Sequence, residues 1–260
     1  MAFERIQPDT VEWATFYGNH IQRYMFAAER LKQLGRCRVL DVACGVGYGS
    51  RFIANECHCE VVGVDRDPDA LKLATSRFSH PDVSFLVDDC HSLEKCGFKE
   101  QFDAIVCFET IEHLAEPGRF LKRCAQLLRP AGLLIMSTPN HSVSGHSAWE
   151  YHLTEYTATQ FVSLLKEFGF KDQILLGQFL TPIGSLRSSV RGELNKVYAN
   201  PFARVGRFIQ RTLRNRRDAG VVLPEQPEDF EIEPVASSKE CEDLGRNGPV
   251  VLVCVAKCEK

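Results

Sequence analysis

Short apolar runs alternate with amphipathic stretches along most of this chain. Apolar runs of this length, each followed by polar residues or a turn, are typical of buried strands. Helical spacing fills the intervals between them. Strands that alternate regularly with helices predict an α/β fold whose sheet is doubly wound and mostly parallel. The predicted strands are 37–42, 60–65, 83–87, 102–108, 133–137, 172–180 and 249–256, and the predicted helices are 10–34, 46–57, 68–78 and 117–128.

The first strand ends in an acid and is followed by alternating glycines. Gly45, Gly47 and Gly49 permit a positive φ and let a ligand approach the backbone without meeting a Cβ atom. The first amides of the following helix, from about Val46, point unpaired at the same place. This pattern predicts a ligand-binding turn after Asp41, although an ordinary tight βα turn is an alternative on this segment alone.

The second strand narrows the choice of ligand. It ends at Asp65, about 20 residues further on, where a nucleotide-binding βαβ unit places a carboxylate on the ribose hydroxyls. The glycine spacing nevertheless differs from the G-x-G-x-x-G pattern of dinucleotide sites. The two strands together therefore favour a nucleoside ligand that is not a dinucleotide.

Several stretches together resemble the core of class I S-adenosylmethionine (SAM)-dependent methyltransferases. They are VLDVACGVGYGS, VVGVDRDPDAL, VSFLVDDC, FDAIVCFETIEHL and LLRPAGLLIMSTPN. The resemblance covers a SAM-binding core over 37–180, closed by a final strand within 249–260. It implies a Rossmann-like, doubly wound, seven-stranded and mostly parallel sheet, with an N-terminal helical cap over 1–36 and a helical insertion over 181–248 before the last strand.

The same resemblance implies where SAM binds. Glycines of the turn border its methionine part, the acid that ends the second strand takes the ribose hydroxyls, and residues after the next two strands receive the adenine and the sulfonium end. The implied cofactor-binding residues are Asp41, Ala43, Gly45 and Gly47 in the turn, Asp65 and Arg66 after the second strand, Asp89 and Cys90 after the third, and Phe108 after the fourth. Ala43 stands where many members of the class have glycine.

A polar stretch of the N-terminal helix carries a further candidate. The segment from Asn19 to Tyr24 is unusually polar for a packing stripe, and a cation here can meet the carboxylate of a methionine moiety. On local grounds a solvated Arg23 is an equal alternative. Ubiquinone-pathway O-methyltransferases carry an arginine at the same distance before the glycine turn. That resemblance implies that Arg23 contacts the cofactor carboxylate.

Two acids and an imidazole follow the fourth strand. If a helix begins here, Glu109, Glu112 and His113 face one way and converge at the methyl-donor end of the cleft. Two nearby carboxylates repel each other unless a cation or a proton lies between them. A hard divalent ion suits such a pair, and oxygen ligands with one or two imidazoles fit magnesium, manganese or non-haem iron better than they fit a thiolate-rich zinc site. The alternative makes Glu112 a surface acid and His113 a lone general base.

The E-x-x-E-H pattern resembles the metal site of ubiquinone-type O-methyltransferases and of small-RNA 3′-terminal 2′-O-methyltransferases. The latter supply a further histidine from a segment after the S-T-P-N turn, which corresponds to His152 here. The resemblance implies Mg²⁺ or Mn²⁺ at Glu109, Glu112, His113 and His152. Glu112, His113 and His152 are the candidate catalytic residues, with either imidazole removing the acceptor proton.

Composition is that of an ordinary globular protein, and it restricts the partners. A net charge of −3 argues against a protein that coats nucleic acid, and no apolar run approaches the roughly 20 residues of a membrane span. Eleven scattered cysteines, an odd number, favour a reducing cytoplasm over a disulfide framework. The cluster Cys57-His58-Cys59 lacks the second pair of ligands that a zinc site needs.

Residues 181–248 separate the last two predicted strands. Basic residues predominate from 185 to 217, and apolar residues at helical spacing predict a basic amphipathic helix over 202–214. Its apolar face can pack on the core as a cap, or the segment 202–217 can make peripheral contact with an anionic membrane. Residues 225–243 are acidic, contain proline and have little to bury, which predicts a loop.

The methyl acceptor follows from resemblance. The motifs N-x-x-x-R-Y-x-F-A, F-E-T-I-E-H-L, S-T-P-N and H-x-x-E-Y-T resemble bacterial methyltransferases of surface-polysaccharide and natural-product pathways. They imply O-methylation of a sugar hydroxyl in a glycan or its precursor. The alternative is a quinone or catechol acceptor at a membrane surface. An RNA 2′-O-methyltransferase and a non-catalytic SAM-binding protein are weaker alternatives. No RNA-binding module is visible, so a nucleic-acid partner is not expected, and the acids and imidazole serve no purpose in holding cofactor alone.

Overall fold

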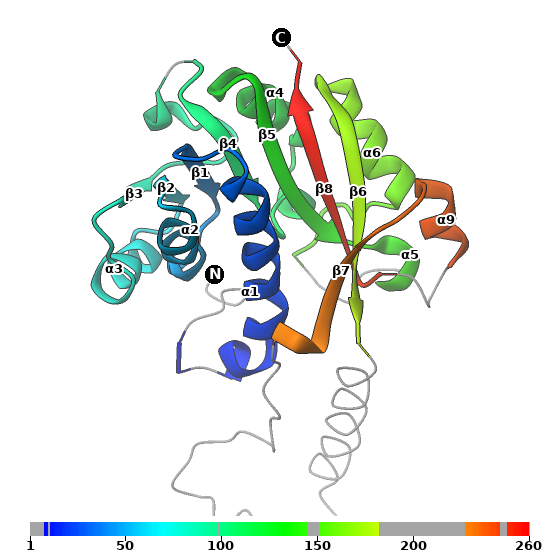
Figure 1. The fold of residues 1–260 in the computed structure, drawn as a ribbon, viewed down its shortest axis with the longest axis horizontal. Helices are drawn as coiled ribbons and strands as arrows, with labels where there is room; N and C mark the ends of the chain where they lie inside the picture. Colours follow the sequence, from blue (N-terminus) through cyan, green and yellow to red (C-terminus); the bar gives the residue numbers. More distant parts are fainter. Residues whose placement is uncertain are drawn as a thin grey trace, which may run out of the picture. The chain divides into compact units, whose positions relative to one another are not determined.

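A single sheet organises this computed structural model, which describes residues 8–9, 11–97, 99–144, 151–181, 227–244 and 249–259 (Figure 1). Its strands are β1 Arg38–Val42, β2 Glu60–Asp65, β3 Val83–Val87, β4 Phe102–Cys107, β5 Leu128–Pro139, β6 Phe170–Leu180, β7 Phe230–Pro234 and β8 Val251–Cys258. Their order across the sheet is β3, β2, β1, β4, β5, β8, β6 and β7.

The sheet is parallel from β3 to β5, and β8 runs antiparallel between β5 and β6. The predicted doubly wound, mostly parallel, Rossmann-like sheet is therefore confirmed. The described part of the chain forms eight strands where seven were predicted. The additional strand, β7, lies in a stretch that was expected to be a loop.

The chain divides into two compact units, Met1–Gln22 with Leu180–Glu231 and Arg23–Phe179 with Ile232–Lys260. Every candidate site residue belongs to the larger unit. In the smaller unit, the rings of Trp13 and Tyr17 stack with centroids 4.2 Å apart. The predicted basic helix over 202–214 and the predicted membrane-contacting segment 202–217 lie outside the described residues. Among the helices that the structure describes, none has the length and apolar character to cross a membrane.

Local sequence explains where several helices begin. The helix after β2 starts at Pro68, and Asp67 Oδ1 accepts a hydrogen bond from Asp69 N at 2.8 Å. A capping box of Thr157 and Gln160 starts the helix before β6. The helices are α1 Val11–Lys32, α2 Tyr48–Cys57, α3 Pro68–Arg77, α4 Pro117–Leu127, α5 His141–Ser144, α6 Ala158–Glu167 and α9 Ser238–Asp243.

One apolar core lies on the side of the sheet that faces α4 and α6. Leu40, Val62 and Ile105 occupy matching positions on neighbouring strands and form a single cluster with Phe120 of α4 and Phe161 of α6. The residues that alternate with them on β1 and β2 point to the other face and are also buried. Burial on both faces explains why these strands read as continuous apolar runs.

The acidic stretch before β8 contains β7 and α9, so the prediction of a loop over 225–243 is wrong for these residues. Cys241 of α9 is fully buried in the apolar core. Glu242 Oε1 accepts a hydrogen bond from Thr159 N of α6 at 3.0 Å, and Ser237 Oγ caps α9 by accepting one from Glu240 N at 3.1 Å. The buried cysteine and the contact with α6 dock this short helix, and the net charge of the stretch does not reveal them.

The parallel register brings the carboxyl ends of four strands to one edge of the sheet. Val42 of β1 pairs with Val64 of β2 and with Cys107 of β4, and Asp65 of β2 pairs with Val87 of β3. Sheets of this kind bind ligands beyond that edge. The candidate residues that follow β1 to β4 therefore lie side by side.

Candidate functional site

The glycine turn between β1 and α2 has the left-handed backbone that its sequence predicts. Ala43, Gly45 and Gly47 have φ values of 57°, 57° and 83°. A Cβ atom at Gly47 would lie 2.5 Å from the ring of Phe85, so glycine is required there. Among the described residues no heavy atom lies within 4 Å of a Cβ built on Gly45, so this side of the turn is open to a ligand. Helix α2 begins at Tyr48, slightly later than expected.

Asp41 lies on β1 next to the turn and is fully buried. Its carboxylate accepts hydrogen bonds from Ser50 Oγ at 2.6 Å and from Tyr24 OH at 3.2 Å. Burial raises the pKa of Asp41 to about 7, the two hydroxyls act to lower it, and the charge of Asp65 raises it. Asp41 thus ties α1 and α2 to β1.

Asp65 ends β2 and faces the same turn. Its Oδ2 accepts a hydrogen bond from Gly45 N at 3.0 Å, and its Oδ1 accepts one from Asp67 N at 2.9 Å. A carboxylate offers about four acceptor positions, so these bonds are compatible with the predicted ribose contact. Asp65 also fixes the turn against the neighbouring strand end.

The candidates for the adenine lie at the ends of β2 and β3. Asp89 accepts a hydrogen bond from His91 N at 2.7 Å, and this bond is the main cause that holds the pKa of Asp89 below its usual value. The charge of Arg66 acts on both Asp89 and Cys90. Burial raises the pKa of the Cys90 thiol to about 11. The structure thus brings Arg66, Asp89 and Cys90 together.

The remaining cofactor candidates are Phe108, which follows β4, and Arg23 of α1. Phe108 packs edge-on against Tyr24 with ring centroids 5.0 Å apart. Arg23 is fully buried, and its Nη1 donates a hydrogen bond to Gln178 Oε1 at 2.6 Å, so the alternative of a solvated arginine is wrong. The positive charge of Arg23 acts to lower the pKa of Glu112, which places the guanidinium near the acids after β4.

The acids after β4 do not begin an α-helix, which was the condition for Glu109, Glu112 and His113 to face one way. Glu109 has a φ of 48°, and a short 3₁₀ helix, η2, spans Ile111–His113. Strand β5 holds both acids. Ser137 Oγ donates to Glu109 Oε1 at 2.8 Å, and Thr138 Oγ1 donates to Glu112 Oε2 at 3.0 Å.

Glu112 is the most constrained acid of the site, and it is fully buried, so the alternative of a surface acid is wrong. Burial raises the pKa of Glu112 well above its usual value, and the charge of Glu109 raises it further. The remaining oxygen, Oε1, accepts no hydrogen bond from any residue that the structure describes. A buried acceptor of this kind calls for a proton or a cation.

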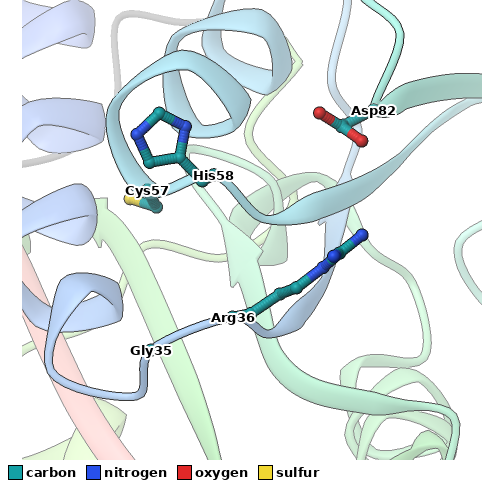
Figure 2. A pocket seen from close by; sticks show the side chains of 5 residues that line it. All are labelled: Gly35, Arg36, Cys57, His58 and Asp82. Carbon is teal, nitrogen blue, oxygen red and sulfur yellow. The ribbon is translucent and has the colours of Figure 1, made fainter.

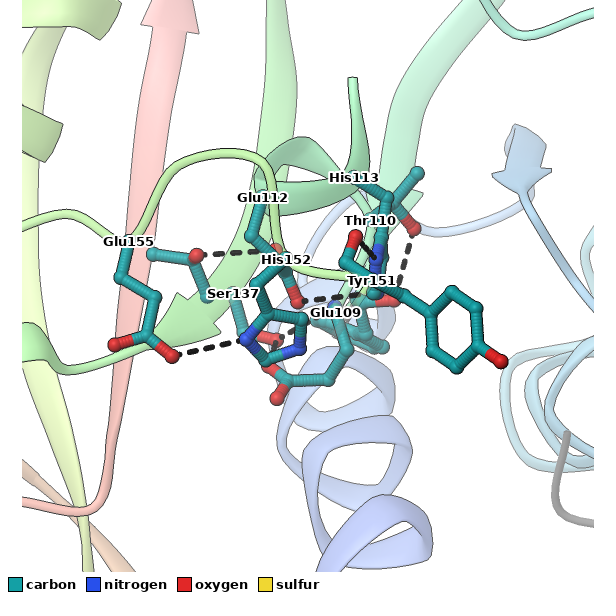
Figure 3. Close-up of polar contacts among 10 residues, drawn as sticks. Glu109, Thr110, Glu112, His113, Ser137, Tyr151, His152 and Glu155 are labelled. Carbon is teal, nitrogen blue, oxygen red and sulfur yellow. Dashed lines mark hydrogen bonds and ion pairs between the residues drawn. The ribbon is translucent and has the colours of Figure 1, made fainter. Parts of the chain in front are cut away.

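Two imidazoles approach this oxygen (Figure 3). His113 Nε2 lies 3.8 Å from Glu112 Oε1, and the rings of His113 and His152 have centroids 4.9 Å apart. One donor atom from each of the three residues lies within 4.8 Å of the others. Glu109, predicted as a fourth member, is not in this group. One carboxylate oxygen with two imidazole nitrogens is a donor set that fits a divalent cation.

Backbone contacts bring His152 to Glu112. The carbonyl oxygen of Glu112 accepts hydrogen bonds from Leu153 N at 2.8 Å and from Thr154 N at 3.1 Å. His113 Nδ1 lies 3.0 Å from the carbonyl oxygen of Tyr151. The segment that carries the second imidazole is therefore fastened to η2 on both sides of His152.

The sequence-based prediction missed Glu155. Its side chain is only 4% exposed, and its Oε1 lies 2.9 Å from His152 Nδ1. The available signal is the H-x-x-E spacing, which is part of the longer H-x-x-E-Y-T motif.

A cavity of about 420 Å³ lies elsewhere on the larger unit (Figure 2). It is lined by Gly35, Arg36, Cys57, His58 and Asp82, which come just before β1, β2 and β3. It therefore lies at the amino-terminal ends of the strands, opposite to the candidate site. The described part of the chain has two clusters of histidine, cysteine or acidic side chains that could hold a metal ion, and none of the residues that line this cavity belongs to either.

Residues 40–136 match the family model described as a methyltransferase domain. The match begins in β1 and ends in β5, so it contains the carboxyl ends of β1 to β4. Residues 40–136 thus carry a methyltransferase domain.

Curated relatives agree with this assignment. A ubiquinone biosynthesis O-methyltransferase of Bradyrhizobium diazoefficiens is 38% identical over 43% of this chain and 44% of its own length. A probable SAM-dependent methyltransferase of Mycobacterium tuberculosis is 32% identical over 62% of this chain and 59% of its own length. The chain thus spans about half the length of these relatives.

Solved structures share the fold of this methyltransferase domain. The [4+2]-cyclase SpnF has a TM-score of 0.60 at 18% identity, over 92% of this chain and 80% of that protein. Phosphoethanolamine N-methyltransferase 2 of Haemonchus contortus, in complex with SAM, has a TM-score of 0.56 at 16% identity, over 87% of this chain and 49% of that protein. At these identities the likeness shows the fold alone.

Proposed function

We propose that this chain transfers the methyl group of SAM to a hydroxyl oxygen. The observation that carries the proposal is the cluster of Glu112, His113 and His152 beyond the end of β4. SAM already carries an activated methyl group on a cationic sulfur, so the difficult step is to present a deprotonated oxygen in line with it. A buried carboxylate and two imidazoles can take the acceptor proton and orient the oxygen.

SAM would lie along the ends of β1 to β4. Gly45 and Gly47 would border its methionine part. Asp65 would accept hydrogen bonds from the ribose hydroxyls, and Asp89 would accept one from the adenine amino group. The open side of Gly45 and the acids at adjacent strand ends support this placement. Arg23 would bind the methionine carboxylate, and support comes from its neighbour Tyr24, which contacts Asp41 and Phe108 at these strand ends.

The donor set also suits a divalent cation such as Mg²⁺ or Mn²⁺, held by Glu112, His113 and His152. Support comes from Glu112 Oε1, a buried oxygen that accepts no hydrogen bond from the described residues. A bound divalent ion lowers the pKa of an acceptor hydroxyl. When no ion is bound, His113 or His152 can accept the proton instead, and the Glu112 carboxylate balances the positive charge that the imidazole gains. Glu109, held by Ser137, adds negative charge nearby.

A sugar hydroxyl of a glycan or glycan precursor is the first candidate acceptor, and a catechol or quinol hydroxyl is the second. Motif resemblance favours the sugar, whereas the relatives that are named for ubiquinone biosynthesis favour the aromatic ring. Both classes of acceptor present two adjacent oxygens. Adjacent oxygens are the arrangement that a divalent ion chelates.

The test is methyl transfer from labelled SAM to glycans, catechols and RNA, with and without EDTA. We expect transfer to one hydroxyl-bearing class, and loss of turnover in chelator while S-adenosylhomocysteine (SAH) still binds. Glu112→Gln should lower kcat by about 100-fold or more, because it keeps the shape of the side chain but removes its charge. The matched control is Glu116→Gln, whose side chain is 65% exposed.

The outcomes separate the parts of this proposal. Full activity in chelator would show that turnover needs no metal and that an imidazole acts as the unaided general base. A Glu112→Gln variant as active as Glu116→Gln would show that the Glu112 carboxylate takes no part in catalysis. Binding of SAH without transfer to any hydroxyl acceptor would contradict O-methyl transfer itself.

A further inference from the structure

Glu155 lies in the segment that delivers His152, and its carboxylate is shared by two imidazoles. Oε1 lies 2.9 Å from His152 Nδ1, and Oε2 lies 3.5 Å from His141 Nδ1. The side chains of Glu155 and His152 are 4% and 10% exposed, so water competes little for these contacts. Such a pair is stronger than an exposed one.

The backbone on either side of Glu155 is fixed. Thr154 N donates to the carbonyl oxygen of Glu112 at 3.1 Å. On the other side, Tyr156 forms a parallel bridge with Asn140, and its carbonyl oxygen accepts a hydrogen bond from His141 N at 3.1 Å. Glu155 therefore sits between two anchored residues, and Figure 3 shows its carboxylate directed at His152.

The chemistry of a carboxylate determines which nitrogen of His152 carries the proton. An ionised carboxylate only accepts hydrogen bonds, so the facing nitrogen, Nδ1, must be the donor. In the neutral ring the other nitrogen, Nε2, then carries the lone pair. His113 reaches the same state by another route, because a carbonyl oxygen, that of Tyr151, lies 3.0 Å from its Nδ1.

We propose that Glu155 is a positioning residue that holds His152 in the Nδ1–H tautomer, so that Nε2 carries its lone pair beside Glu112 and His113, where it can meet a proton or a divalent ion. Either use of that lone pair needs this tautomer. The lone pair can take the proton of the acceptor hydroxyl, or it can bind a divalent ion. The consequence for turnover rests on the proposed function, whereas the tautomer itself does not.

The first measurement is nitrogen NMR of the histidine rings in the protein without metal or SAM, at a pH where the rings are neutral. We expect the Nδ1–H tautomer for His152 in the wild-type protein. Glu155→Gln keeps an acceptor oxygen and should retain it. Glu155→Leu removes the acceptor and should shift His152 toward Nε2–H. His152→Gln assigns the signal, and the ring of His80 serves as the internal control.

The Nε2–H tautomer in the wild-type protein would overturn the proposal, and that result needs no variant to fold. An unchanged tautomer in folded Glu155→Leu would also overturn it.

The second measurement is turnover with whichever acceptor is found. Replacing a group that orients a catalytic or ligating histidine costs about 10- to 100-fold, and we expect Glu155→Leu to lose that much kcat. The KM for SAM should change less than about twofold, and Glu155→Gln should restore most of the rate. Wild-type kcat in Glu155→Leu would contradict the role in turnover. If no acceptor is methylated, the proposed function fails while the tautomer result stands.

Discussion

Replacing Asp41 by asparagine should stabilise the protein at neutral pH but not in acid. Asp41 is fully buried, and burial raises its pKa from its usual 3.8 to about 7. The folded protein therefore binds this proton more tightly than the unfolded chain does. Stability from the protonated group is fully present below the unfolded pKa and is lost as the pH rises toward the folded pKa.

The size of the effect follows from the two pKa values. A difference of about three pH units at about 1.4 kcal/mol per unit gives about 4 kcal/mol of unfolding free energy, lost between about pH 4 and pH 7. The asparagine of the Asp41→Asn variant does not ionise, and its side-chain oxygen can still accept from Ser50 and Tyr24, so the variant should not show this loss. The titrating groups that do not interact with Asp41 are common to both proteins and cancel in the difference.

The assay is urea unfolding of the wild-type protein and Asp41→Asn across pH 4 to about pH 8. The free-energy difference between them should change by about 4 kcal/mol in favour of the variant as the pH rises. Asp82→Asn, a change at a half-exposed side chain, is the control and should stay within about 0.5 kcal/mol of the wild type. A difference between wild type and Asp41→Asn that is constant with pH would refute the reasoning.

Other substitutions test the turn and the cofactor site. Asp65→Ala should weaken SAH binding by at least about tenfold, because charge-assisted bonds contribute about 1.5–3 kcal/mol each, and calorimetric affinity within about twofold of the wild type would exclude the ribose contact. Ala43→Gly should stabilise by about 0.5–1 kcal/mol in urea unfolding, because the left-handed backbone strains alanine; a loss would show that the strain is absent. Gly49→Ala should cost about 1–3 kcal/mol, since its Cβ would lie 2.0 Å from the Tyr24 ring, and Gly49→Ala in a Tyr24→Leu background should cost less.

Local sequence was sufficient for the elements of the core. Apolar runs and helical spacing predicted β1 to β5 and the helices between them, because strand and helix periods depend on neighbouring residues. The acids Asp41 and Asp65 could be placed at one edge as soon as the strands were parallel. The glycine turn was likewise predictable, since left-handed backbone is a local preference.

Tertiary contacts decided the rest of the site. Local sequence left Arg23 open between solvent and cofactor, and only the resemblance favoured the cofactor. The structure buries Arg23 against Gln178 of β6, 155 residues further along the chain. Where a helix was only a condition of the sequence argument, the structure has a left-handed Glu109 followed by η2. Strand β5 supplies Ser137 and Thr138, which hold the two acids.

Glu155 shows the same limit. Its function depends on a bridge between Asn140 and Tyr156 and on amides that reach the carbonyl oxygen of Glu112. Periodicity along the chain carries information about neighbours in sequence, whereas these contacts join residues that only the folded sheet brings together. The sequence by itself determined the scaffold and the edge at which ligands bind. The tertiary structure decided which acids are buried, which imidazoles meet, and which carboxylate orients them.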